Sequence, residues 1–464
     1  MRWIGCADIA GTTVVDDLVS GWCEDPRFDA NPDERIGVVS CRVDLDRELL
    51  DRRLRRSGID PIGVSLIDLE SWEGDDASRL AARLAAAKAR SPGPRTTPVE
   101  HLRLHMPPVV SRRTLLAFRE PSYRVVPRPD HQRCRAADGC RACVEVCPHD
   151  ALEWSSGRIE HDRLACESCG RCVVACPAGA MVHPSFPPER VEAEISAFAE
   201  VTDGAFGVEF YCTRAPAPAG APGWLQVRIP CVGMASPHWL AVPLSLGASA
   251  TTAAECACGM ESDASARRSA LLDAARSLLD AAGMDPGRIT DDTTAPPLAD
   301  SPGMGPITSG FGPLGAAALG SGFPSIDWHH PLAAAGTVEI DASICTGCEI
   351  CAKVCPSRAL EIVPSDGHLS VSFDPARCTA CGQCIGRCPE PGAITLTPVI
   401  DSANLALGSR ELVSVELARC RVCGGSVAPT PTLERLRRQL GDDTSFAYIA
   451  STCIECRAIG RTSA

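Results

Sequence analysis

Residues 203–290 alternate between short apolar runs and longer helical patterns. The runs "GAFGVEFYC", "LQVRIPC" and "ATTAAEC" predict strands, and each run ends at a cysteine. "SPHWLAVPLSLGA" predicts a helix, and so does "ARRSALLDAARSLLDAAG", in which Leu and Ala recur at helical spacing before a glycine. Strands that alternate with helices predict a parallel sheet.

Residues 1–90 show the same alternation. "RWIGC", "RIGVVSC" and "GVSLIDLE" predict three strands, while "VVDDLVSGW" and "RELLDRRLRRSG" predict helices between them. The first two strands end at Cys6 and Cys41, and Cys23 follows the first helix. The carboxyl ends of the strands in an open α/β sheet share one edge, where ligands bind. We therefore expect two α/β domains, each with cysteines at a sheet edge.

Four shorter apolar runs, "ALEW", "GAMVHP", "RALEIV" and "AITLTP", each follow a cysteine-rich loop. Three of these loops are "CESCGRCVVACP" at 166–177, "CTGCEICAKVCP" at 345–356 and "CTACGQCIGRCP" at 378–389. The fourth loop, "CRAADGCRACVEVCP" at 134–148, has five residues rather than two between its first two cysteines. The pattern predicts two compact α+β units of strands, loops and short helices. The expected fold class is multidomain α/β and α+β.

The cysteine spacing within these loops is typical of iron–sulfur ligands. Three thiolates on one loop bind three corners of a 4Fe-4S cube, and the fourth, just before a proline, reaches the neighbouring cube. The loops therefore work in pairs. Their crossing predicts four ligand sets: Cys134, Cys140, Cys143 and Cys176; Cys166, Cys169, Cys172 and Cys147; Cys345, Cys348, Cys351 and Cys388; Cys378, Cys381, Cys384 and Cys355.

These loops carry a family resemblance. Residues 130–185 and 338–398 resemble the bacterial two-cluster ferredoxins, which implies two units with two clusters each. The alternative is that some quartets bind zinc, because zinc also takes four thiolates. All sixteen cysteines are present, which favours four 4Fe-4S clusters over a three-iron variant.

The length and the net charge of the chain limit the classes of function that it can have. A chain of 464 residues predicts several domains, and its net charge of −13 argues against a general nucleic-acid binder. The start "MRWIGCADIAG" lacks a secretory signal, and the apolar stretch "HWLAVPLSLGASA" is shorter than the about 20 residues of a membrane span. The 27 cysteines in short repeated spacings then indicate a metalloprotein of the reducing cytoplasm.

The region 200–290 carries its own candidate site. Cys212, Cys231, Cys256 and Cys258 lie at or just beyond the ends of its predicted strands, and four thiolates suit a 2Fe-2S cluster. A zinc site or buried unliganded cysteines are the alternatives. "VEFYC", "VRIPCVGMASPHWL", "ECACGM" and "RRSALLDAARSLLDAAGMDPGRI" resemble the delta subunit of methyl-viologen-reducing hydrogenase. That resemblance implies electron relay through a 2Fe-2S cluster.

"GCADIAG", "CEDP", "VVSC" and "ESW" resemble the amino-terminal domain of the flavin-binding subunit of heterodisulfide reductase, which implies a cluster there. Only Cys6, Cys23 and Cys41 are present, so a cluster with an oxygen or external fourth ligand and a metal-free domain both stay open. The large flavin domain of that family has no counterpart here, and we expect no flavin in this chain. "GFGPLG", in a Gly, Ala and Pro-rich stretch, predicts a linker rather than a dinucleotide site.

The carboxyl-terminal segment carries two further cysteine pairs. "CRVCGG" supplies Cys420 and Cys423, "CIEC" supplies Cys453 and Cys456, and "TLERLRRQL" predicts a helix between them. Two paired knuckles favour a closed tetrahedral zinc site in a zinc-ribbon-like tail, although a single iron uses the same geometry.

The predicted domains are an amino-terminal α/β domain at 1–90, a linker at 91–129, a two-cluster unit at 130–188, an α/β domain at 200–290, a linker at 291–335, a second two-cluster unit at 336–400 and the tail at 410–464. No catalytic residues stand out. We expect an electron-relay subunit whose partners are a flavoprotein, a dehydrogenase or hydrogenase, and heterodisulfide reductase-like subunits. The alternatives are a self-contained flavin-dependent oxidoreductase and an iron–sulfur redox sensor or scaffold.

Overall fold

The structure is a computed structural model. It describes residues 2–5, 18–19, 36–40, 66–68, 77–90, 102–105 and 122–459, without 184–185, 203–204, 214–222, 256–263, 295–310, 312–313, 323–324, 366 and 442–443. Among these residues, none of the helices combines the length and the apolar character that a bilayer crossing requires.

A three-stranded parallel sheet forms the centre of the 200–290 region, as the sequence predicts. Its strands are β12 (Trp224–Ile229), β11 (Gly207–Cys212) and β13 (Ala250–Ala253), in that order across the sheet. Every residue of β11 and β13 is buried, which explains why these strands do not alternate between apolar and exposed polar positions.

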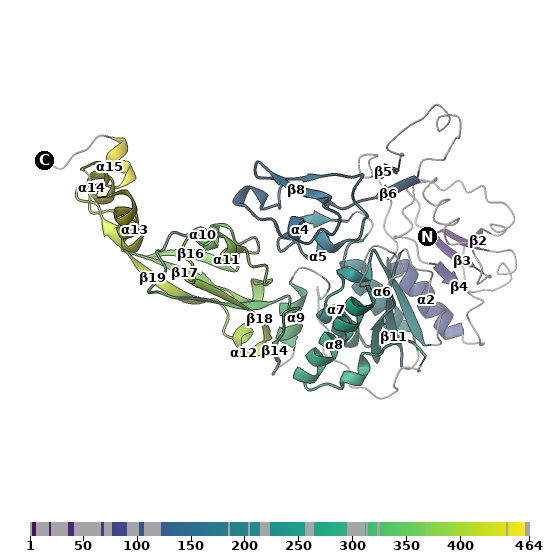
Figure 1. Ribbon diagram of the computed structural model, residues 1–464. Helices are drawn as coiled ribbons and strands as arrows, with labels where there is room; N and C mark the ends of the chain where they lie inside the picture. The colour runs from purple at the N-terminus through teal and green to yellow at the C-terminus, as the bar shows by residue number, and fades with distance from the viewer. Residues whose placement is uncertain are drawn as a thin grey trace, which may run out of the picture.

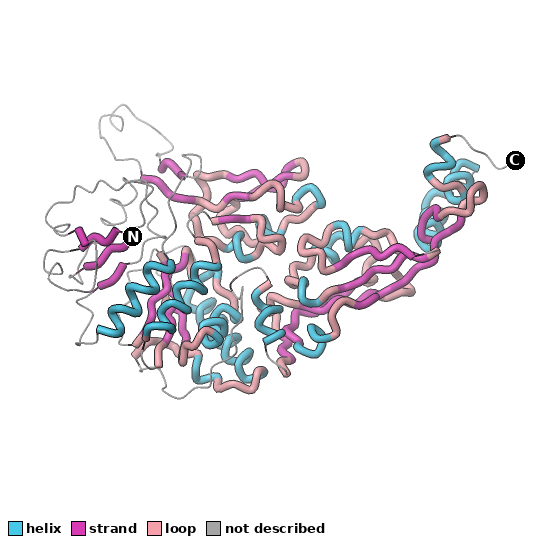
Figure 2. Tube along the Cα trace, turned by 180° about the vertical axis from the view of Figure 1, so that it is seen from behind, coloured by secondary structure: helices cyan, strands magenta, loops and turns pink. Residues whose placement is uncertain are grey.

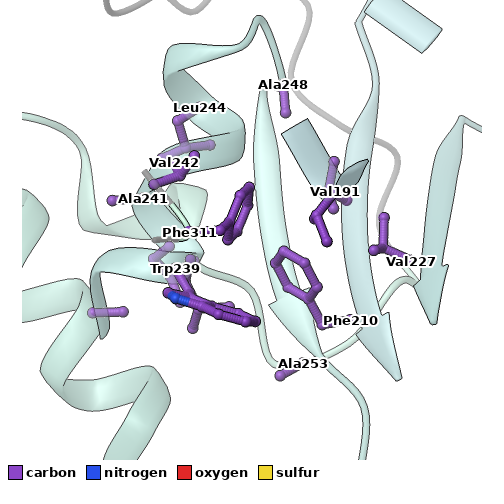
Figure 3. Packing of buried hydrophobic residues seen from close by; sticks show 14 of the residues in the cluster. Val191, Phe210, Val227, Trp239, Ala241, Val242, Leu244, Ala248, Ala253 and Phe311 are labelled. Atoms are coloured by element: carbon purple, nitrogen blue, oxygen red, sulfur yellow. The ribbon is translucent and has the colours of Figure 1, made fainter. Parts of the chain in front are cut away.

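Helices cover both faces of this sheet. α7 (Pro237–Ser245) and α8 (Ala264–Ala281) lie on one face, and α2 (Ala77–Arg90) and α6 (Glu189–Val201) on the other (Figures 1 and 2). Phe210 of β11 and Trp239 of α7 both pack on Phe311, with ring centroids 5.9 and 5.1 Å from it (Figure 3). This core packs against the sheet whose edge carries Cys212 and Cys231.

Four short parallel strands form the amino-terminal sheet, in the order β2 (Leu18–Val19), β1 (Arg2–Gly5), β3 (Ile36–Ser40) and β4 (Leu66–Asp68). The prediction of a helix at "VVDDLVSGW" is wrong for its central residues, because Leu18 and Val19 form a strand that pairs with β1. β-branched and apolar residues there fit a sheet as well as a helix. The predicted ligands Cys6, Cys23 and Cys41 lie outside the described residues.

The first unit (residues 130–188) is built from two antiparallel pairs and two short helices. The strand β7 (Arg128–Pro129), just before the unit, pairs with β10 (Met181–Val182), and β8 (Leu152–Ser155) pairs with β9 (Arg158–His161). The helices are α4 (Ala142–Glu145) and α5 (Arg171–Val174). Both helices carry cysteines of the predicted ligand sets.

The second unit (residues 336–400) repeats this plan with longer strands. β15 (Gly336–Ile340) and β18 (Ile394–Asp401) are antiparallel, as are β16 (Leu360–Ser365) and β17 (His368–Phe373). The short helices are α10 (Ile350–Lys353) and α11 (Gln383–Arg387). Strand-like runs after all four loops are thus strands, as the sequence predicts.

The tail continues a sheet of the second unit. β19 (Arg410–Arg419) pairs with β17 and then with β20 (Ser426–Pro429), so one sheet runs from the second unit into the tail (Figure 1). α13 (Thr430–Leu440), α14 (Thr444–Ser451) and α15 (Ile454–Ala458) complete it, after α12 (Ser402–Ala406). The tail is therefore tied to the second unit through backbone hydrogen bonds.

Two segments that we expected to be linkers contain structure in their described parts. β5 (Leu102–His105) and β6 (Ser122–Val125) form an antiparallel pair within 91–129. Within 291–335, Phe311 is 1 % exposed, α9 (Gly315–Gly322) is largely buried, and β14 (Asp327–His329) pairs with β18. The Gly and Ala content that suggested a linker instead lets α9 pack closely against the central core.

Candidate iron–sulfur centres

The stretched first loop folds back onto the common geometry. The five residues between its first two cysteines contain a 3-10 turn at Ala136–Asp138, which ends at Gly139 with φ +91°. Arg135 and Asp138 form an ion pair of 2.9 Å across the turn, and the indole nitrogen of Trp154 donates to the Ala136 carbonyl at 2.9 Å. The insertion is therefore a local turn that still brings Cys140 near Cys134.

The other three loops share a backbone conformation that few residues adopt. The residue before the second cysteine is Ser168, Gly347 or Ala380, with φ of +57°, +71° and +51°. Non-glycine residues with positive φ cost free energy, and such positions concentrate at ligand sites. Ser168 and Ala380 therefore carry this cost, whereas Gly347 adopts the same conformation without it.

The structure brings the first unit's cysteines together in the crossed sets. Cys134, Cys140 and Cys143 each lie within electrostatic range of Cys176, which comes from the other loop of the pair. Burial, followed by the charge of neighbouring thiols, raises the pKa of Cys140 to about 11 and that of Cys143 to about 12. Thiols are thus neutral before a metal binds, and metal binding must release their protons.

The second ligand set of the first unit takes its fourth cysteine from the preceding loop. Cys172 lies near Cys166 and Cys169 of its own loop and near Cys147 of the preceding loop. Burial raises the pKa of Cys172 well above its ordinary value. The exchange of the fourth cysteine is therefore reciprocal within the unit.

The second unit shows the same reciprocal exchange. Cys345 lies near Cys348 and Cys388, while Cys384 lies near Cys378, Cys381 and Cys355. The first of these sets lines a pocket together with Thr346, Gly347, Glu349 and Ile394, among others. Burial raises the pKa values of Cys351, Cys378 and Cys384 to about 12.

The residues around the sets fit a thiolate-bound cluster. Backbone N–H groups donate to sulfur from Ser168 to Cys166 at 3.4 Å, from Ala180 to Cys176 at 3.2 Å and from Ala359 to Cys355 at 3.2 Å. Apolar residues surround the sulfur atoms in both units. Four thiols in apolar surroundings with N–H donors to sulfur are the donor set of a 4Fe-4S cube, whose potential those hydrogen bonds tune.

Two of the four cysteines predicted for the central domain lie in the described residues. Cys212 ends β11 and is fully buried, with its thiol donating to the Pro230 carbonyl at 3.6 Å. Cys231 follows β12, and its sulfur accepts from the Gly233 N–H at 3.3 Å. Both therefore lie at the carboxyl edge of the sheet. Cys256 and Cys258 lie outside the described residues.

A pocket of about 490 Å³ lies between the first unit and this edge. Cys147 and Arg171 line it from the first unit, and Gly233, His238 and Trp239 from the central domain. Burial lowers the pKa of His238 to about 4, so this imidazole is neutral at neutral pH. The pocket thus connects the Cys147 side of the first unit with the Cys231 loop.

The tail brings its four cysteines together as the sequence predicts. The sulfur atoms of Cys420, Cys423, Cys453 and Cys456 all lie within 4.8 Å of one another, which suits a single metal ion. Hydrogen bonds from the backbone, first from the Cys453 N–H, lower the pKa of Cys420 to about 6. At least one thiolate is therefore available to a metal at neutral pH.

The comparisons with known proteins identify the two units. A family model described as a 4Fe-4S dicluster domain matches residues 133–180 and 344–393. These two segments of the chain are thus ferredoxin-like and match 4Fe-4S dicluster domains. These dicluster domains, the first and second units, support an iron–sulfur electron-transfer role.

Curated relatives are ferredoxins and match short parts of the chain. A "Ferredoxin 7Fe" of Hydrogenibacillus schlegelii is 39% identical over 49 residues, which is 11% of this chain and 63% of that protein. An uncharacterized ferredoxin of Methanocaldococcus jannaschii is 39% identical over 51 residues, which is 11% of this chain and 28% of that protein. A second uncharacterized ferredoxin of the same organism is 44% identical over 39 residues, which is 8% of this chain and 26% of that protein. The chain spans less than two thirds of each relative.

Sequence reasoning missed the residues that join the parts. Gln383 and Arg387 of the second unit contact the first unit. In α13 of the tail, Thr432 contacts Thr346 of the second unit, and Arg435 contacts Glu390. Gln383 and Arg387 lie between or beside ligand cysteines, yet a sequence does not say which surface they meet.

Proposed function

We propose that the chain is an electron-relay subunit of a heterodisulfide reductase-like, hydrogenase or formate dehydrogenase complex. Its two dicluster domains would hold four 4Fe-4S clusters at the four crossed cysteine sets. The observation that supports this proposal is that the fourth cysteine of every loop lies with the first three cysteines of the paired loop, so the clusters would be held in adjacent pairs. Clusters held in this way carry single electrons between partners.

Further metal sites belong to the same proposal. Cys212, Cys231, Cys256 and Cys258 would hold a 2Fe-2S cluster, supported by the position of the first two at the sheet edge. The tail cysteines would hold one zinc, supported by the 4.8 Å grouping of their sulfur atoms. A further cluster at Cys6, Cys23 and Cys41 remains a hypothesis.

Partners would supply the chemistry that this chain lacks. A flavoprotein would exchange electron pairs for single electrons, and a dehydrogenase, a hydrogenase or a heterodisulfide reductase-like protein would act on the substrate. The reducing cytoplasm would keep the thiols available for clusters.

Isolation from the native host tests this proposal. The tagged full chain is purified without oxygen, and proteins that accompany it in fixed ratio are identified. We expect a flavoprotein together with a dehydrogenase, hydrogenase or heterodisulfide reductase-like subunit. Recovery of the chain alone with its clusters intact would argue for a free electron carrier or a sensor instead.

The pocket beside Cys147 supports one alternative, a flavin-dependent oxidoreductase that acts by itself. Its volume of about 490 Å³ and its lining by Trp239 and Arg171 suit a flat aromatic ligand with polar substituents. Acid extraction of the pure chain followed by fluorescence measures bound flavin. About one flavin per chain would establish this alternative, and its absence would leave the relay subunit.

A further inference from the structure

The two dicluster domains touch through their cluster-binding loops. The Arg387 side chain donates from Nη2 to the Gly139 carbonyl at 2.8 Å. Gly139 directly precedes Cys140, and Arg387 directly precedes Cys388. The contact therefore joins residues that lie next to predicted cluster ligands in both domains.

Gln383 forms a second bridge between the same loops. It is 6 % exposed, its Nε2 donates to Glu145 Oε2 at 3.4 Å, and its Oε1 accepts from the Arg141 N–H at 3.4 Å. The guanidinium of Arg141 lies 4.3 Å from the Trp154 ring centroid, which fixes the loop that Gln383 contacts. A neutral amide here satisfies a donor and an acceptor without placing a buried charge between the domains.

The ligand cysteines themselves approach each other at this contact. Cys140 of the first unit lies within electrostatic range of Cys381 of the second. Within the units, Cys143 lies in the same range of Cys172, and Cys351 of Cys384. The four predicted sets thus follow one another in space, from Cys166 to Cys134, then Cys378, then Cys345.

We propose that electrons pass between the two dicluster domains from the Cys134 set to the Cys378 set or in reverse, and that Gln383 and Arg387 are positioning residues that hold these sets together. The proposal rests on the electron-relay function and specifies its internal route. The step moves one electron: one cluster is oxidised by one electron and its neighbour is reduced by one, with no bond formed or broken. The two outer sets, at Cys166 and Cys345, are then the ends of the route.

The magnetic interaction between clusters tests the junction in the full chain. The holoprotein is reduced anaerobically with dithionite, and its EPR spectrum is recorded together with iron content and electron uptake. In Gln383→Glu, the new carboxylate faces Glu145 and repels it. We expect loss of the inter-domain part of the spin–spin broadening, while the interaction within each domain stays. Raising the ionic strength should restore part of the loss, since salt screens charges that are not fully buried.

Three further variants make the result specific to the junction. Combining Gln383→Glu with Glu145→Gln exchanges amide and carboxylate, keeps the hydrogen bond and should return the wild-type spectrum. Arg387→Ala should reduce the broadening as Gln383→Glu does. Arg377→Ala removes an arginine that pairs with Glu361 at 3.2 Å within the second unit, and it should leave the spectrum unchanged.

The outcomes separate the junction from the relay function. Full electron uptake with a wild-type spectrum in both Gln383→Glu and Arg387→Ala would overturn the junction while leaving the relay intact. A chain that takes up no electrons in its wild-type form would overturn the relay itself. If iron content falls in Gln383→Glu and the double variant does not restore it, the residue has a folding role only, which also overturns the proposal.

Discussion

At the scale of single residues, Glu209 is the clearest departure from an apolar core. It lies on β11, is 6 % exposed, and accepts a hydrogen bond from Gln226 Nε2 at 3.4 Å. Burial raises the pKa of Glu209 to about 7, and the hydrogen bond from Gln226 and the charge of Arg268 offset this rise only in part. The carboxyl is therefore protonated in the folded chain at pH values where the unfolded chain has released its proton.

This pKa predicts a stability that falls as pH rises. Below about pH 4 the carboxyl is protonated in both states. Between about pH 4 and about 7 only the unfolded chain loses its proton, so the free energy of unfolding decreases through that window. We expect Glu209→Gln to be more stable than wild type at pH 8, on the order of 1–3 kcal/mol, and similar at pH 4. Anaerobic denaturation at both pH values measures this, with the exposed Glu200→Gln as control; an equal effect at both would contradict it.

Gly170 and Gly382 offer a matched pair at the same position of two loops, directly after the second cysteine. Their φ values are +78° and +70°, so alanine costs about 1–2 kcal/mol at either. A Cβ at Gly170 would lie 2.8 Å from Met234 Sδ, whereas nothing lies within 4 Å at Gly382.

We therefore expect Gly170→Ala to lower stability by about 1–3 kcal/mol more than Gly382→Ala, because overpacking adds to the backbone cost. Anaerobic thermal unfolding compares the two variants. Combining Gly170→Ala with Met234→Ala should remove most of the difference; if the gap persists, the contact with Met234 is not its cause.

At the scale of elements, α2 shows which part of the fold can be predicted from the sequence and which part cannot. Hydrophobic periodicity predicts the three strands and two helices of the central domain. Cysteine spacing predicts the crossed loops of the two units. α2 was expected to belong with residues 1–90, yet its Ala82 and Ala86 pack in the core of the central domain. An amphipathic pattern reveals that a helix has an apolar face but not which surface covers it. The contact of Gln383 with Arg141, across 242 positions, escapes sequence reasoning for the same reason.

Arg90 fixes α2 to that core. Its guanidinium donates to Glu194 of α6 at 2.7 Å and to the Arg228 carbonyl of β12 at 2.7 Å, and both charged side chains are nearly fully buried. Arg90→Ala would leave the Glu194 carboxylate buried without its partner. We expect a loss of about 3–5 kcal/mol in the free energy of unfolding.

Denaturant unfolding of the anaerobic protein measures this loss. Lys88→Ala, at an exposed position of the same helix, is the control and should change stability by less than about 0.5 kcal/mol. Equal effects of the two variants would show that α2 does not depend on the ion pair.

At the scale of the whole molecule, the tail lies at the far end of the sheet that leaves the second unit (Figure 1). Thr432 donates to the Thr346 carbonyl at 2.6 Å, and Arg435 pairs with Glu390 at 2.8 Å, so α13 rests on the loop of the Cys345 set. The proposed metal would hold the second half of the tail to the first.

Cys456→Ser tests the metal of the tail. We expect the loss of one zinc per chain and an unchanged EPR spectrum of the reduced clusters, because the other ligand sets are intact. Elemental analysis of the anaerobic protein measures zinc and iron together. Loss of one iron instead would assign a mononuclear iron site, and unchanged contents of both metals would contradict a metal at these four cysteines.

The exchange of fourth cysteines also bears on how the protein is made. Cys176 lies 33 positions after Cys143, so a ribosome adding about 5–20 residues per second needs about 2–7 s to supply the last ligand of the first set. During that interval the nascent loop presents three thiols and an open corner. A cluster delivered then would be held incompletely, so delivery has to follow synthesis of the whole pair. For the proposed 4Fe-4S clusters, each dicluster domain is accordingly the smallest piece of this chain that a cluster-assembly system can fill.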